Sequence, residues 1–302
     1  MSSPMTTDQA RGRSAAIAPE ATVGTVRLTV SDLARSRAFY EQVLGLRAAE
    51  LESGALSLSA GADGFPLVEL HADASAPALD RRATGLYHLA LLFPSRRDLA
   101  FALGRVAQAR WPLDGASDHL VSEALYLSDP DGNGIELYRD RPRSEWRYDG
   151  GELQMSTLPL DLENLLDELR SETDWQPAAP TGTRMGHVHL QVSDLAATEA
   201  FYAGVLGFDV VVRGYPGALF VSAGGYHHHL GLNTWHSRGS GPAAPGAVGL
   251  RSYDVVLPDA PALEAVLERV RAGGLPVEPA PDVAGAALVR DPSGNGVVLR
   301  VG

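Results

Sequence analysis

The sequence of 302 residues contains no cysteine and no lysine, and each absence excludes a class of chemistry. Without cysteine the chain forms no disulfide, no thiolate nucleophile and no iron–sulfur ligand set. All 25 basic residues are arginine, so no lysine Schiff base is available for covalent catalysis. A chain without disulfides also suits the cytoplasm, which is the location we predict.

Long apolar runs and an excess of positive charge are also missing. No segment approaches the ~20 apolar residues that a membrane-spanning helix needs. Residues 1–21 lack the apolar core of a signal peptide, and we expect them to form a disordered tail. The formal net charge of -12 disfavours nucleic acid and anionic membranes as partners, because both would require a basic face. A small-molecule partner fits this composition better.

An internal repeat organises the rest of the chain. Four short motifs recur, each 162 residues further along. They are Val30-Ser31-Asp32-Leu33-Ala34, repeated from Val192; Phe39-Tyr40, from Phe201; Val43-Leu44-Gly45, from Val205; and Asp129-Pro130 with Gly132-Asn133-Gly134, from Asp291. This constant offset predicts two homologous halves, residues 22–140 and 184–302. Residues 141–183 then form a linker, in which 160–169 have the spacing of a helix.

Each half divides again into two units with the order strand, helix, several strands. The four units are residues 22–72, 84–140, 184–236 and 248–302. Helices are expected at 32–44, capped by Ser31 or Asp32, at 95–109, capped by Ser95, at 194–206, and from near Asp259 to Gly273. Apolar patterning predicts the strands, which are 26–30, 55–59, 66–71, 86–93, 187–192, 210–213, 218–222 and 226–233.

One stretch, residues 118–139, combines metal-binding residue types with a turn signal. It reads DHLVSEALYLSDPDGNGIELYR and contains His119, Tyr126 and Glu136. Asn133-Gly134 is typical of a tight hairpin turn, so we expect two short apolar strands that hold the polar side chains at fixed heights. This hairpin is the first candidate for a metal site.

The hairpin resembles the signature of the type I extradiol ring-cleavage dioxygenases, members of the vicinal oxygen chelate superfamily. That signature has a His, a spacer, an apolar-Tyr pair, an Asp-Pro-x-Gly turn and a final Glu. Its counterparts here are His119, Leu125-Tyr126, Asp129-Pro130-Asp131-Gly132 and Glu136. Ser117 departs from it, because the family usually has Gly, Asn, Thr or an aliphatic residue there. The longer run to Ser144 resembles bacterial two-domain catechol 2,3-dioxygenases, and the resemblance covers nearly all of residues 22–302.

The resemblance implies an α+β fold of four βαβββ modules, in which two modules wrap a curved sheet around one cleft. Metal ligands in the superfamily come from the first and last strands of a module. The corresponding positions here are Thr25, His88, His187 and Ser252 on first strands, and Glu136 and Val298 on last strands. The resemblance therefore implies that His88, His187 and Glu136 bind one metal ion. Two imidazoles and one carboxylate suit non-haem Fe(II), and Mn(II) is the alternative.

The distribution of these ligands predicts how the modules pair. The first and second modules together would be one His short, and the third and fourth would offer His187 with Ser252 and Val298, which cannot bind iron. Pairing the second module with the third gathers all three ligands. We therefore expect modules 2 and 3 to form the metal site, and modules 1 and 4 to form a structural, metal-free pair.

The remaining histidines have weaker assignments. Within His227-His228-His229, the resemblance indicates His228 as the acid/base beside the substrate, and a polar strand end is the alternative interpretation. His119 and Tyr126 match the family's pair that hydrogen-bonds the substrate. His189 faces the same side of its strand as His187, as a second candidate ligand or a pocket residue. We expect His71 and His236 to lie on the surface.

The function implied by the resemblance is extradiol ring cleavage, in which Fe(II) and O2 open a catechol to a muconic semialdehyde. One alternative on the same fold is a glyoxalase-type isomerase, in which Glu69 would join His88 and Glu136. Another is a metal-free protein that binds small molecules. A homo-oligomer is compatible with the sequence.

Overall fold

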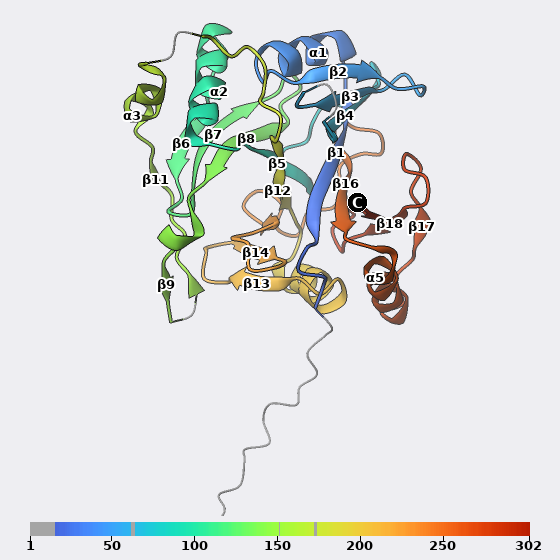
Figure 1. Ribbon diagram of the computed structural model, residues 1–302. Coiled ribbons are helices and arrows are strands. Elements are labelled where there is room, and N and C mark those ends of the chain that lie inside the picture. The colour runs from blue at the N-terminus through green and yellow to red at the C-terminus, as the bar shows by residue number, and fades with distance from the viewer. Residues whose placement is uncertain (1–15, 62–63, 151, 172–173) are drawn as a thin grey trace, which may run out of the picture.

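Two large curved β-sheets form the framework of the molecule, with helices packed on their outer faces (Figure 1). The computed structural model describes residues 16–61, 64–150, 152–171 and 174–302. The first sheet has the order β17-β18-β19-β16-β1-β4-β3-β2. Its strands are β1 (Thr22–Val30), β2 (Arg47–Glu50), β3 (Leu56–Ser59), β4 (Pro66–Ala72), β16 (Gly249–Leu257), β17 (Glu278–Pro279), β18 (Ala287–Arg290) and β19 (Gly296–Val301).

The second sheet has the order β11-β6-β7-β8-β5-β12-β15-β14-β13. Its strands are β5 (Gly85–Leu92), β6 (Gly115–Asp118), β7 (Ser122–Ser128), β8 (Gly134–Asp140), β11 (Leu158–Pro159), β12 (Arg184–Gln191), β13 (Asp209–Val212), β14 (Ala218–Ser222) and β15 (Leu230–Asn233). A separate two-stranded ribbon lies in the linker and consists of β9 (Tyr148–Asp149) and β10 (Glu152–Leu153).

The predicted pairing of modules is confirmed by the sheet order. The first sheet joins modules 1 and 4 through the antiparallel pair β1 and β16. The second joins modules 2 and 3 through the antiparallel pair β5 and β12. In Figure 1 the blue strand β1 accordingly lies beside the orange strand β16, although they come from opposite ends of the chain.

The helices begin where side chains can cap them. In each long helix the cap accepts a hydrogen bond from the backbone N–H three residues later, which satisfies a donor that the helix leaves free. The caps are Asp32, Ser95, Asp194 and Asp259. The helices are α1 (Leu33–Gln42), α2 (Arg96–Gln108), α4 (Leu195–Glu199), which continues as a π-helix (Ala200–Val205), and α5 (Ala260–Ala272).

The hairpin turn differs from the prediction. Gly134 already pairs with Ser128 as the first residue of β8, so Asn133-Gly134 is not a two-residue turn. The connection runs over residues 129–133 and takes its positive φ of 90° at Gly132. The carboxylate of Asp129 accepts from the backbone N–H groups of Asp131 and Asn133, which stabilises this wider turn.

The repeated motifs meet where the two sheets adjoin. The Tyr40 hydroxyl of α1 donates to Asp129 in the hairpin turn at 3.2 Å, and its counterpart Tyr202 donates to Asp291 at 3.1 Å. The Ser31 backbone N–H also donates to Asp131 at 2.9 Å. The motifs that recur in the sequence therefore connect modules 2 and 3 to modules 1 and 4 of the other sheet.

The linker helix is observed at the predicted place. It consists of α3 (Leu162–Leu166) and a 3₁₀ turn (Asp167–Leu169), which follow the short 3₁₀ turn Arg143–Glu145 earlier in the linker. Arg96 of α2 donates to the Asn164 side chain and pairs with Glu168, so the linker helix is docked on α2.

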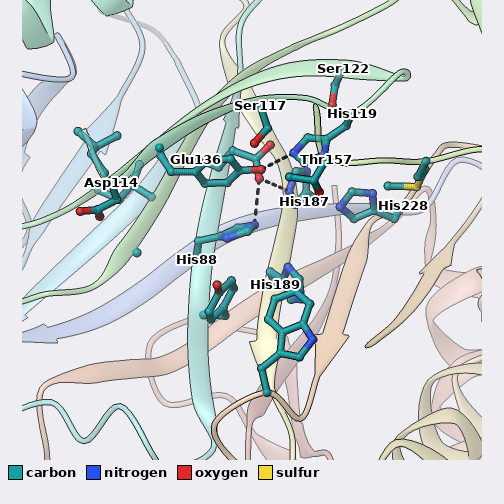
Figure 2. Close-up of a pocket in the computed structure, with 18 of the residues that line it drawn as sticks. His88, Asp114, Ser117, His119, Ser122, Glu136, Thr157, His187, His189 and His228 are labelled. Carbon is teal, nitrogen blue, oxygen red and sulfur yellow. Dashed lines mark hydrogen bonds and ion pairs between the residues drawn. The ribbon is translucent and has the colours of Figure 1, made fainter. Parts of the chain in front are cut away.

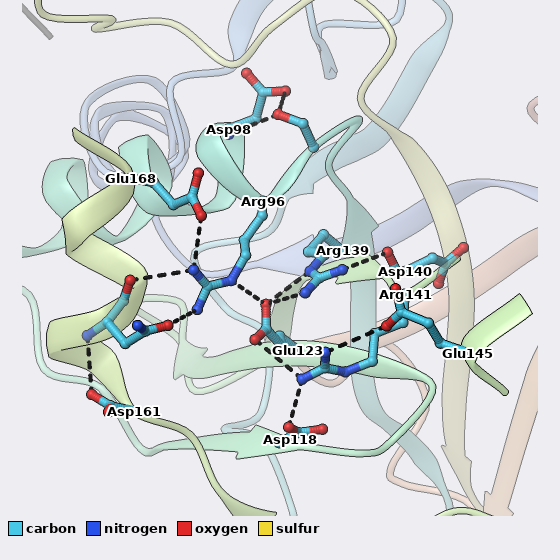
Figure 3. A network of polar contacts seen from close by, with 12 residues as sticks. Arg96, Asp98, Asp118, Glu123, Arg139, Asp140, Arg141, Glu145, Asp161 and Glu168 are labelled. Atoms are coloured by element: carbon cyan, nitrogen blue, oxygen red, sulfur yellow. Dashed lines mark hydrogen bonds and ion pairs between the residues drawn. The ribbon is translucent and has the colours of Figure 1, made fainter. Parts of the chain in front are cut away.

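The same Arg96 belongs to a network centred on the buried carboxylate of Glu123 (Figure 3). Arg96 and Arg139 approach the Glu123 carboxylate at 2.9 and 2.7 Å, and Arg141 approaches it at 3.3 Å. Because Arg96 of α2 also contacts the linker helix, the ion pairs with Glu123 connect the hairpin, α2 and the linker helix.

Two sequence expectations need correction at this level. Residues 1–15 of the expected disordered tail lie outside the described residues, but Ile17 and Ala21 are buried, and the Ile17 N–H donates to the Gly207 carbonyl. The strand expected at 226–233 starts only at Leu230, because residues 227–229 form a loop against β14. Among the described helices, none has the length and apolar character to span a membrane.

Candidate metal centre

The candidate ligands lie on three neighbouring strands of the second sheet. Ala90 of β5 stands opposite Glu136 of β8 on one side and His187 of β12 on the other. His88 is two residues before Ala90 and therefore faces the same side of the sheet. The small Ala90 side chain leaves space between the three larger ones. Figure 2 shows the side chains of His88, Glu136 and His187 pointing toward one another.

The distances between the ligand atoms suit one metal ion. Glu136 Oε2 lies 3.0 Å from His88 Nε2 and 3.1 Å from His187 Nε2, and one ligand atom from each residue lies within 4.8 Å of the others. Ligand atoms about 2.1 Å from a metal and at right angles are about 3.0 Å apart. Although His88 Nε2 lies 3.0 Å from Glu136 Oε2, the two atoms do not have the geometry of a hydrogen bond, and this nitrogen has no hydrogen-bond partner among the described residues. A buried nitrogen without a partner beside a carboxylate fits a cation.

The protonation states also fit cation binding. Burial alone would raise the pKa of Glu136, but the imidazoles of His187 and His88 outweigh it and hold this pKa well below its ordinary value. Burial lowers the pKa of His187, although Glu136 opposes the shift. Ionised carboxylate and neutral imidazole are the forms that coordinate metals.

Tyr126 and His119 form a hydrogen-bonded pair next to these ligands. Tyr126 of β7 stands opposite Glu136 in the ladder, and its hydroxyl lies 2.6 Å from His119 Nε2. The other ring nitrogen of His119, Nδ1, lies 2.7 Å from the Ser156 carbonyl. A carbonyl only accepts, so Nδ1 carries the proton and Tyr126 donates to Nε2. Burial and the Glu136 charge raise the pKa of Tyr126 well above its ordinary value, which keeps that donor proton in place.

A cavity of about 520 Å³ opens in front of the three ligands. His88, Glu136 and His187 line it together with Tyr126 and His119. Its lining also includes an aromatic wall of Tyr87, Phe220 and Trp235, whose rings pack around that of His189. An apolar wall with a few convergent polar groups is typical of a site for a small organic ligand, and the volume lies within the usual range of about 300–1,000 Å³.

His228 is the member of the histidine triplet that reaches this cavity. Its ring centroid lies 4.2 Å from that of His187, and it lines the cavity wall (Figure 2). His227 is fully buried and bonds to Asp140 instead. His229 accepts from the Ala223 N–H and lines a different cavity. This placement favours His228 over its two neighbours as the residue beside a substrate.

His189 lies next to the three ligands but outside their set. Its ring centroid is 4.9 Å from that of His88, and the group of ligand atoms within reach of one metal ion does not include it. Gly231 of β15 lies against its ring, where an added Cβ would be 2.8 Å from Cγ of His189. The sequence left His189 as either a second candidate ligand or a pocket residue, and this position favours the pocket residue.

The carboxylate needed for the glyoxalase-type alternative is not near the cavity. Glu69 lies in β4 of the other sheet, where it pairs with Arg27 at 2.9 Å, so the set of Glu69, His88 and Glu136 is not brought together. His236 is exposed as expected. His71 is only partly exposed and lies 3.9 Å from Glu69, so its assignment to the surface holds only in part.

Some residues of the site had no signal in the sequence. The aromatic wall comes from module 2 (Tyr87) and module 3 (Phe220 and Trp235). Tyr87 and Phe220 are single aromatics in apolar strands and look like core residues, and Trp235 follows the end of β15. Ser156, which fixes the tautomer of His119, comes from the linker. The contact depends on a backbone carbonyl, which every residue offers, so sequence pattern cannot reveal it.

Comparisons with known proteins agree with this architecture. The model of the Glyoxalase/Bleomycin resistance protein/Dioxygenase superfamily matches twice, at residues 22–137 and 184–299. A Bacillus subtilis (strain 168) protein named Catechol-2,3-dioxygenase is 44% identical over 283 residues, which cover 92% of this chain and 96% of that protein.

Solved structures share the fold at low sequence identity. A structure from Bacillus subtilis subsp. subtilis str. 168 has a TM-score of 0.63 at 14% identity, covering 93% of this chain and 84% of that one. Glyoxalase I from Zea mays has a TM-score of 0.57 at 18% identity, covering 93% and 92%. The predicted fold class is confirmed, and the chain belongs to the Glyoxalase/Bleomycin resistance protein/Dioxygenase superfamily.

Proposed function

We propose that this protein is an extradiol ring-cleaving dioxygenase that uses Fe(II) and O2 to open a catechol to a muconic semialdehyde. The observation that carries the proposal is the convergence of His88, Glu136 and His187 in a cavity that also contains the Tyr126 and His119 pair. The 44% identity to a protein named Catechol-2,3-dioxygenase supports the same activity.

His88, His187 and Glu136 are the residues that would hold the metal, with Mn(II) as the alternative to Fe(II). Iron bound there would acidify the catechol hydroxyls as a Lewis acid and supply the redox chemistry with O2. Two imidazoles and one carboxylate leave coordination positions open, which substrate oxygens require.

The protein's own groups bind, orient and deprotonate the substrate. His228 accepts a proton from a catechol hydroxyl, because burial and the neighbouring imidazoles lower its pKa well below the ordinary value and leave it neutral. Tyr126, which lines the same cavity, orients the substrate. The aromatic wall of Tyr87, Phe220 and Trp235 packs against the ring of the catechol and excludes water.

Oxygen consumption coupled to ring opening tests the proposal. The full-length protein is loaded with Fe(II) under argon, mixed with catechol and air-saturated buffer, and followed with an oxygen electrode and by the absorbance of the semialdehyde. We expect equal molar consumption of catechol and O2. The Mn(II)-loaded protein is assayed in parallel to decide between the two metals.

Two variants and two competing activities complete this experiment. Glu136→Ala should lose turnover, whereas Glu69→Gln, a matched buried carboxylate of the other sheet, should retain it. Isomerisation of a methylglyoxal–thiol adduct by the metal-loaded wild-type protein, without catechol cleavage, would overturn the proposal in favour of a glyoxalase. Catechol binding without oxygen uptake would indicate a binding protein.

A further inference from the structure

A row of three hydrogen-bonded side chains leads from the cavity to the protein surface. His228 Nδ1 lies 2.8 Å from His227 Nδ1, and His227 Nε2 lies 2.8 Å from the carboxylate of Asp140. His227 has no exposed surface, whereas the Asp140 side chain is 25% exposed. Neither His227 nor Asp140 lines the cavity, so neither can touch a substrate there.

The direction of each hydrogen bond follows from the carboxylate. Ionised Asp140 can only accept, so His227 Nε2 carries a proton. In a neutral His227, Nδ1 is then a lone-pair acceptor, and His228 Nδ1 must be the donor to it. The proton of neutral His228 therefore lies on Nδ1. Its Nε2 carries a lone pair and is the ring nitrogen left for the cavity.

The surroundings hold this row in place. The His227 ring packs against the rings of Tyr226 and Trp146, with centroid separations of 4.1 and 5.5 Å. The Tyr226 hydroxyl donates to the Asp140 carboxylate at 3.0 Å, and Tyr138 lies within hydrogen-bond distance of the same hydroxyl, at 2.8 Å. His227 and Tyr226, which both bond to the Asp140 carboxylate, are therefore held in place by ring packing and by the hydrogen bond between Tyr226 and Tyr138.

Strand β8 connects this row to the metal ligands. Glu136, Tyr138 and Asp140 alternate along β8 and face the same side of the sheet. Tyr138 also packs against the ring of His187, with a centroid separation of 4.8 Å. The strand that provides the carboxylate ligand therefore also fixes the distance between that ligand and the far end of the row.

We propose that Asp140 and His227 are positioning residues that hold His228 in the tautomer with an unprotonated Nε2 facing the substrate. The kinetic part of this inference rests on the proposed function, since it assigns His228 the proton of the catechol. The tautomer itself is a property of the folded chain and can be measured without any turnover.

Nitrogen NMR of the imidazole rings tests the tautomer. The full-length protein is labelled with ¹⁵N-histidine and loaded with diamagnetic Zn(II), and the His228 signals are identified with His228→Gln. We expect His228 of the wild type to be protonated at Nδ1 alone. In Asp140→Ala and in His227→Phe, which retains a ring in the aromatic pocket, His228 should populate both tautomers.

A matched variant controls for local disturbance. His229→Phe replaces a neighbour that is also buried but does not belong to the row, and it should leave the His228 tautomer unchanged. Asp140→Glu retains a carboxylate and should restore the wild-type tautomer. An unchanged His228 tautomer in Asp140→Ala and His227→Phe would overturn the proposal. If one of these variants does not fold, the His228 tautomer of the other decides.

Steady-state kinetics with catechol test the consequence. Asp140→Ala should lower kcat roughly ten- to hundredfold, as expected when a charge-assisted hydrogen bond that orients a histidine is lost. KM should stay within about twofold, because the row does not contact the substrate. A rise in KM with unchanged kcat would overturn the positioning role. Absence of catechol turnover in the wild type would refute the proposed function, and the NMR result would still decide the tautomer.

Discussion

Removing the Tyr126 hydroxyl tests the chemistry of the site with the smallest change in shape. Tyr126→Phe deletes the donor that lies 2.6 Å from His119 Nε2 and leaves the packing of the ring intact. In the proposed reaction this hydroxyl would donate its one proton to the negatively charged substrate in place of His119 Nε2. A hydrogen bond to a charged group contributes about 1.5–3 kcal/mol, which corresponds to a roughly ten- to hundredfold loss of kcat.

The loss of kcat can be separated from loss of metal or of folding. Metal content is measured after dialysis and should remain at the wild-type level, because the variant keeps all three residues that would hold the metal, His88, His187 and Glu136. Tyr202→Phe provides the control, since it removes a buried hydroxyl that donates to Asp291 in the repeated turn of the other half. It should lower the free energy of unfolding by about 1 kcal/mol and leave kcat unchanged.

A double-mutant cycle then links the effect to His119. Tyr126→Phe and His119→Gln should each be deleterious, and together hardly worse than the more severe single variant, because both break the same hydrogen bond. Wild-type kcat in Tyr126→Phe at full metal content would refute the reasoning and reduce the tyrosine to a packing residue.

Three further predictions concern the metal and the stability of the fold. Chelation should abolish catechol turnover and added Fe(II) should restore it under reducing conditions, whereas recovery with Zn(II) or Ni(II) alone would contradict a role in oxygen activation. Glu136→Gln should weaken metal affinity at least tenfold by equilibrium dialysis, because the one anionic ligand is lost, whereas Glu69→Gln should not. Glu123→Gln should lower the free energy of unfolding in urea by about 3 kcal/mol, because it leaves three guanidinium groups around a neutral side chain. Glu264→Gln, which breaks an exposed pair with Arg271, should cost less than about 1 kcal/mol.

The sequence was most informative where a pattern has a physical period. Polar residues at the start of apolar helical patterns were enough to predict the caps Asp32 and Ser95. The expectation that His187 lies near Glu136 followed instead from the resemblance to the extradiol dioxygenases and from the pairing of modules that its ligand positions implied. The nearest atoms of the two residues are 3.1 Å apart.

Contacts that depend on non-local packing could not be predicted. The hairpin turn was misplaced because Asn-Gly favours a tight turn locally, whereas the Asp129 carboxylate and the bond from Tyr40 stabilise a wider one. The packing of Ile17 against the third module required knowledge of both surfaces. The domain bounds, the cytoplasmic location and a homo-oligomer stay predictions, because no observation tests them.

The two sheets place different groups at matching positions of their central strand pairs. In the second sheet His189 stands opposite His88, and in the first sheet Arg27 stands opposite Ser252. The Arg27 guanidinium pairs with Glu69 at 2.9 Å and with Asp254 at 2.6 Å.

The difference between the sheets is one of charge balance. Asp254 also pairs with Arg300, so two carboxylates in the first sheet are matched by two guanidinium groups of the protein itself. In the second sheet the Glu136 carboxylate lies beside the imidazoles of His88 and His187. These imidazoles are neutral when they bind a metal. Among the described residues, no arginine therefore balances the charge of Glu136 as Arg27 and Arg300 do in the first sheet. A buried carboxylate is costly without a cation. The proposed metal ion would supply in the second sheet the charge that Arg27 and Arg300 supply in the first, so one repeated fold would hold a structural pair of modules and a metal-binding pair.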